Sequence, residues 1–169
     1  MHKALLIFPT IFILFCNFVD LQAYAEARDL CLCIGDMEGK TVFKRAMKEG
    51  DGFAIRFTHS VALTPVTDYY KIIDGSIYLD KTEYQDFGAG LPHNPEGEEK
   101  MRTEHGKIII EGFNRKLPEF DVRVGRVASH RLLLFPGQNR EEELALDTVA
   151  APGAALHFYI TEKCADAGN

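Results

Sequence analysis

The chain has 169 residues, and 46% of them are hydrophobic, which is enough to build a buried core. Acidic residues outnumber basic residues by 25 to 19, so the formal net charge is −6 at pH 7. This balance disfavours binding to nucleic acid or to an anionic membrane surface, because both carry charge of the same sign.

Residues 1–25 have the pattern of a secretory signal peptide. A short polar start is followed by an apolar run over 4–19 and by an A-x-A cleavage sequence at 23–25. The apolar run is short for a segment that has to cross about 30 Å of hydrocarbon. We therefore expect export to the periplasm, no membrane attachment after cleavage, and a single domain over 26–169.

Three cysteines follow the expected cleavage site, namely Cys31, Cys33 and Cys164. Disulfides persist in the periplasm, and an odd number of cysteines leaves one thiol unpaired. Cys31 and Cys33 are two residues apart on an expected strand, so they share a face and are poorly placed to bridge each other. We expect Cys164 to pair with one of them, and the pattern leaves open which one.

Apolar and polar residues alternate with a period of two along most of the remaining chain, which predicts β-strands. Asp74-Gly75 separates two such runs and is the strongest hairpin signal. Strands are expected near 30–35, 40–46, 53–60, 66–73, 76–79, 107–113, 120–124, 131–135, 144–149 and 154–160. Many short strands with Gly or Pro between them predict an all-β domain, either an antiparallel β-sandwich or a partly open barrel.

His59 and Asp68 are polar residues on strand faces that are otherwise apolar. If a tight connection joins the strands at 53–60 and 66–73, the two side chains lie nearly opposite each other and pair. The pair has three interpretations: a structural hydrogen bond, a ligand or metal site, or catalysis. Ser60 points to the opposite face from His59, so a hydrolytic triad of Ser60, His59 and Asp68 fails on geometry.

The sequence FGAGLP at 87–92 predicts a tight turn. Gly88 and Gly90 can take positive φ, Ala89 separates them, and Pro92 stiffens the exit. Such a turn can also point backbone N–H groups at an anion, although the lysine and hydroxyl of a phosphate loop are missing. The polar stretch 93–105 follows, and we expect it to be a loop.

Four motifs of this chain resemble those of the small exported proteins called domain of unknown function 1850. They are THSV at 58–61, PVTD at 65–68, FGAGLP at 87–92 and SHRL at 129–132. The resemblance spans most of the chain after the signal segment. Members of that family are typically encoded beside TRAP-type transporters of the TAXI subclass, so the resemblance implies a periplasmic role near solute uptake.

Together these features predict a non-catalytic accessory protein or small-ligand-binding module, without an assigned cofactor, metal or catalytic residue. The candidate ligand-binding residues are His59, Ser60, Asp68, Gly88, Ala89, Gly90 and Pro92. The expected partners are a TAXI-type TRAP transporter component or a small organic acid. Two alternatives stay open: a metal-dependent periplasmic enzyme centred on His59 and Asp68, and a structural partner of a transporter subunit.

Overall fold

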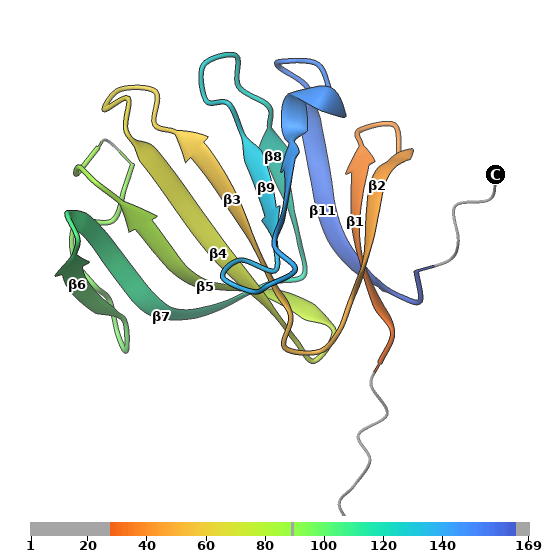
Figure 1. Cartoon of the computed structure of the whole chain (residues 1–169), viewed down its shortest axis with the longest axis horizontal. Helices are drawn as coiled ribbons and strands as arrows, with labels where there is room; N and C mark the ends of the chain where they lie inside the picture. The colour runs from red at the N-terminus through yellow and green to blue at the C-terminus, as the bar shows by residue number, and fades with distance from the viewer. Residues whose placement is uncertain (1–27, 89, 165–169) are drawn as a thin grey trace, which may run out of the picture.

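The alternating apolar pattern builds two antiparallel sheets that pack face to face (Figure 1). The structure is a computed structural model that describes residues 28–88 and 90–164, so the predicted signal segment 1–25 lies outside the described residues. The four-stranded sheet has the order β2 (Thr41–Met47), β1 (Leu30–Asp36), β11 (Ala155–Glu162) and β8 (Glu119–Arg123). The seven-stranded sheet has the order β10 (Glu142–Ala145), β9 (Arg131–Leu134), β3 (Gly52–Thr58), β4 (Pro65–Ile73), β5 (Ser76–Tyr84), β7 (Lys107–Leu117) and β6 (Lys100–Glu104).

The all-β prediction is confirmed, and of its two variants the fold is the sandwich, because neither sheet closes on itself. Two local predictions are wrong. The stretch expected as a loop at 93–105 contains β6, whose five residues are all exposed and therefore show no alternation of apolar and polar residues. The strand expected at 144–149 ends at Ala145 and continues as a short 3₁₀ helix, η1 (Leu146–Thr148).

Four stacked aromatic rings join the two sheets in the middle of the core. Phe53 and Tyr70 come from the seven-stranded sheet, and Phe120 and Phe158 come from the four-stranded sheet. Ring centroids lie 4.9 Å apart for Phe53 and Tyr70, 4.9 Å for Tyr70 and Phe120, and 5.1 Å for Phe120 and Phe158. Each such contact adds about 0.5–1.5 kcal/mol beyond the burial of apolar area.

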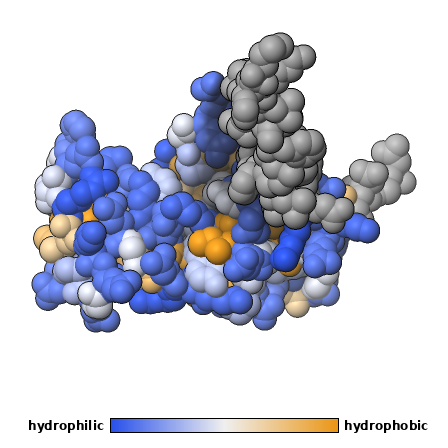
Figure 2. All heavy atoms as spheres, turned by 90° about the horizontal axis from the view of Figure 1, so that it is seen from below, coloured by the Kyte–Doolittle hydropathy of each residue, from blue (hydrophilic) through white to orange (hydrophobic). Residues whose placement is uncertain are grey.

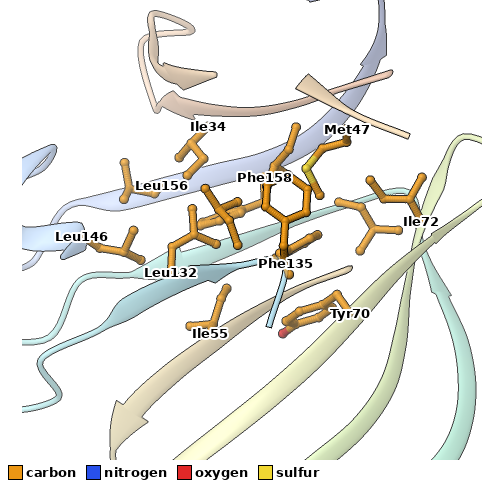
Figure 3. Close-up of a cluster of buried hydrophobic side chains, with 14 of the residues drawn as sticks. Ile34, Met47, Ile55, Tyr70, Ile72, Leu132, Phe135, Leu146, Leu156 and Phe158 are labelled. Carbon is orange, nitrogen blue, oxygen red and sulfur yellow. The ribbon is translucent and has the colours of Figure 1, made fainter. Parts of the chain in front are cut away.

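Aliphatic side chains from both sheets surround these rings (Figure 3). Ile34 and Leu156 extend from the four-stranded sheet, and Ile55 and Leu132 face them from the seven-stranded sheet. All four side chains are at most 3% exposed. The core is therefore built from the inward-facing positions of both sheets, as the period of two requires.

The four-stranded sheet covers only part of the larger sheet, because β5, β7 and β6 extend beyond it (Figure 1). On this side a second, smaller apolar cluster forms from Val66, Tyr84, Ile108 and Ile110. Leu91, from the segment between β5 and β6, packs against this cluster. A loop therefore partly covers the inner face of the larger sheet here, where a sheet covers it elsewhere.

A disulfide joins Cys31 in β1 to Cys164, which follows β11. This confirms the expected pairing of Cys164 with one of the two early cysteines and selects Cys31. Cys33 is buried with a free thiol, and its Sγ lies 3.6 Å from the hydroxyl oxygen of Thr161. Because β1 and β11 are neighbours in the sheet, the bond fixes the start of the sandwich to its end.

Figure 2 shows a face that is mostly hydrophilic, with a small hydrophobic group near its middle. Within 28–88 and 90–164, no helix has the length and apolar character needed to cross a bilayer.

Candidate functional site

The four sequence motifs meet around two hollows at one end of the larger sheet. The first, of about 370 Å³, is lined by Phe57, His59, Ser60, Ala128 and His130 and is called the histidine hollow here. The second, of about 440 Å³, is lined by Val66, Asp68, Leu79, Thr82, Phe113 and Arg115 and is called the aspartate hollow. Gly90 and Leu91 line both hollows, so the glycine-rich segment separates them.

His59 organises the loop between β3 and β4. Its Nδ1 accepts hydrogen bonds from the backbone N–H groups of Val61 and Ala62, at 3.2 and 3.0 Å. Its backbone carbonyl accepts from Leu63, and its backbone N–H donates to Thr64. Because Nδ1 is an acceptor, the proton of the neutral ring resides on Nε2. His59 is 8% exposed, and these bonds supply partners for its Nδ1 and for both of its backbone polar groups.

His130 occupies the opposite side of the histidine hollow in the same manner. Its Nδ1 accepts a hydrogen bond from the backbone N–H of Gly125, and its ring stacks on Phe57 with centroids 5.5 Å apart. Burial lowers the pKa of His130 below its usual value, which favours the neutral ring. Two imidazoles, each accepting hydrogen bonds from backbone N–H groups at Nδ1, thus hold the loops that line this hollow.

The segment at 88–91 forms a tight turn, as predicted, in which the backbone N–H of Leu91 donates to the carbonyl of Gly88. Gly90 has a φ of +89°, so it takes the positive φ expected of this segment. The carbonyl of Pro92 accepts a hydrogen bond from the Tyr84 hydroxyl, which fastens the segment to β5. Ala89 lies outside the described residues.

Gly88 is required for a different reason, because the ring of His59 lies directly against it. A Cβ atom at Gly88 would be only 2.6 Å from Cε1 of His59. No side chain fits without moving either the imidazole or the turn. The close approach therefore couples two motifs that are far apart in the sequence.

The expected pairing of His59 with Asp68 is wrong. β3 and β4 pair so that Asp68 lies opposite Ile55, four residues before His59. At about 3.3 Å per residue, this register separates the two positions by roughly 13 Å along the strand. The cause is the length of the connection: β3 ends at Thr58, and the loop held by His59 extends to Thr64.

Asp68 instead accepts a hydrogen bond from the Thr82 hydroxyl, at 2.7 Å, on the inner face of the larger sheet. It lies between the main core and the smaller apolar cluster, because its neighbours on this face are Val66 and Tyr70. Burial among these side chains raises the pKa of Asp68 above its usual value, and the bond from Thr82 only partly opposes this effect. Asp68 forms no ion pair with any described residue.

Six residues that line the aspartate hollow are not among the candidates from the sequence: Val66, Leu79, Thr82, Leu91, Phe113 and Arg115. Thr82 lies opposite Asp68 only because of a β-bulge in β5, and an irregularity in β7 precedes Arg115. Neither feature leaves a clear signal in the sequence. The guanidinium of Arg115 lies 5.9 Å from the centre of the Phe113 ring.

Of the remaining candidates, Ser60 lines the histidine hollow and Pro92 lines the aspartate hollow. Among the described residues, no group of three or more His, Cys, Asp or Glu side chains is arranged to hold a metal ion. The chemistry that the two hollows offer is hydrogen bonding, one carboxyl, one guanidinium and apolar walls.

The fold and the hollows define a β-sandwich with a loop-covered recess on its larger sheet. The chain belongs to the family described as Domain of unknown function (DUF1850), whose model matches residues 53–141. This stretch contains all four motifs and both imidazoles of the histidine hollow. No curated protein and no solved structure matches the chain.

Replacing Gly88 by Ala is expected to lower the free energy of unfolding by about 1–3 kcal/mol, because the added methyl group collides with His59. In a His59→Ala background the same change should cost much less. Urea unfolding of the wild type, both single variants and the double variant measures this coupling. An equal cost of Gly88→Ala in both backgrounds would show that His59 does not exclude the side chain.

Asp68→Asn is expected to raise the free energy of unfolding at pH 7. Because the folded pKa of Asp68 is above the unfolded value near 3.8, its contribution to stability is present below pH 3.8 and is lost as the pH rises through the folded pKa. The advantage of the amide should therefore shrink at pH 3. Urea unfolding at both pH values tests this, with the exposed Asp147→Asn as control. The prediction is contradicted if the stability of Asp68→Asn, measured relative to wild type, is lower at pH 7 than at pH 3.

Proposed function

We propose that this chain is an exported small-ligand-binding module and that the aspartate hollow is its binding site. The observation that carries the proposal is the position of Asp68, a half-buried carboxyl that opens into a recess with apolar walls. The volume of about 440 Å³ is in the range of small-molecule sites. Apolar walls with a few polar groups are the usual composition of such sites.

A periplasmic location is part of this proposal. The signal-like segment at 1–25 supports it. The disulfide between Cys31 and Cys164 also supports it, because such bonds persist in oxidising compartments.

We further propose that the module works beside a TAXI-type TRAP transporter and that its ligand is a small organic acid. The transporter component rests on the family resemblance. An acidic ligand is supported by Arg115, which supplies the positive charge at the recess.

The alternative of a metal-dependent enzyme has less support. It was centred on His59 and Asp68, and the register places these residues apart. Nδ1 of His59 is already engaged by two backbone N–H groups. A ligand-binding role does not require His59 and Asp68 to lie close together, because Asp68 lines the recess without His59.

Native mass spectrometry of protein purified from the periplasm tests the proposal. We expect the wild type to carry a small organic molecule and Asp68→Asn to lose most of it, because the Asp68 carboxyl contacts a polar group of the ligand other than its acid group. The exposed Asp147→Asn serves as the matched control and should retain the molecule. A wild-type spectrum without any small molecule, or equal occupancy in Asp68→Asn, contradicts the assignment of the site. A transporter subunit or a metal in the same spectrum would support the corresponding alternative.

A further inference from the structure

We infer that the aspartate hollow binds a zwitterion, a small organic acid that carries an amino group and an apolar side chain. The inference rests on the proposed function and specifies its ligand. The ammonium group of the ligand meets Asp68, and its carboxylate meets Arg115. The apolar side chain lies against Val66, Leu79 and Phe113.

The first support is that a β-bulge in β5 keeps the positively charged Lys81 away from Asp68. In the hairpin of β4 and β5, Tyr70 pairs with Leu79, but Tyr69 pairs with Lys81, so Asp80 is an extra residue. Without this bulge, Lys81 would lie opposite Asp68. With it, Thr82 takes that position and donates a hydrogen bond of 2.7 Å to the carboxyl.

Lys81 is used on the other face of the sheet. Its Nζ lies 2.7 Å from the carboxylate of Glu83 and 4.1 Å from the centre of the Tyr69 ring. The bulge thus moves Lys81 away from Asp68 and gives its ammonium group other partners. A half-buried carboxylate without a cation is costly, and a ligand ammonium group supplies the missing charge.

The second support is the placement of Arg115. It pairs with Leu79, which pairs with Tyr70, the next inward-facing residue after Asp68 on β4. The two charged residues are therefore one inward position apart along the strands, about 7 Å, and two strands apart across the sheet, about 10 Å. The long Arg115 side chain extends across part of this separation, and both residues line the same recess, so a ligand whose two opposite charges are close together can meet both. Arg115 is exposed at the mouth of the recess, near the Phe113 ring, and is available to a carboxylate.

Sets of three matched compounds test the inference by isothermal titration calorimetry, on protein that has been unfolded and refolded to remove copurified ligand. One set is leucine, 4-methylpentanoate, which lacks the amino group, and 3-methylbutylamine, which lacks the carboxylate. Equivalent sets are built on valine and phenylalanine. In at least one set we expect the amino acid to bind ten-fold or more tightly than both partial compounds.

Two variants test which protein residue recognises the amino group of the ligand and which recognises its carboxylate. Asp68→Asn should abolish the preference for the amino acid over the deaminated acid, and Arg115→Gln should abolish the preference over the amine. Lys116→Gln is the matched control for Arg115, because Lys116 is also exposed but points to the other face of β7, and it should leave both preferences unchanged.

The outcomes separate the inference from the proposed function. Binding of the deaminated acids as tight as that of the amino acids overturns the zwitterion, as does the absence of binding in all three sets. If a small molecule copurifies with the wild type in either case, the proposed function stands with a ligand of another class. Unchanged preferences in Asp68→Asn and Arg115→Gln also overturn the inference, because the charges would then be recognised elsewhere.

Discussion

The stacking of Phe53, Tyr70, Phe120 and Phe158 is the contact on which the rest of the structure depends. It holds a sheet of four strands against a sheet of seven, on the side of β9, β3 and β4. The unequal sizes leave the part of β5 and β7 around Tyr84, Ile108 and Ile110 without a partner sheet. The segment that carries Leu91 partly fills this space, and the recess with Asp68 lies beneath its edge.

The two hollows use their polar residues differently. In the histidine hollow, His59 and His130 are occupied by backbone groups and set the shape of the loops. In the aspartate hollow, Asp68 has only a hydroxyl as partner, and burial raises its pKa. A group that is held at a cost to stability without a compensating ion pair is more typical of a binding site than of a structural contact. The first hollow therefore positions the glycine-rich segment, and the second offers the chemistry.

Sequence patterns predict much of the fold because the period of two directly encodes which side chains face the core. They predict the hairpin at Asp74-Gly75 and the disulfide to Cys164, both of which the structure contains. They miss β6, because an exposed edge strand has no apolar face to reveal it. They also misplace Asp68. The loop held by His59 sets the register of β3 and β4, and the bulge at Asp80 sets the register of β4 and β5. Neither feature can be recognised from the local alternation of apolar and polar residues.

The most direct measurement of the central claim is the titration of the Asp68 side-chain carboxyl by carbon-13 NMR, in the ligand-free protein and with leucine present. If Asp68 is half-buried without a cation, its pKa in the ligand-free protein lies above the usual value of about 3.8, and a bound ammonium group lowers it. A pKa at or below 3.8 without ligand would mean that Asp68 is solvated or already paired. That result would contradict the account of the recess.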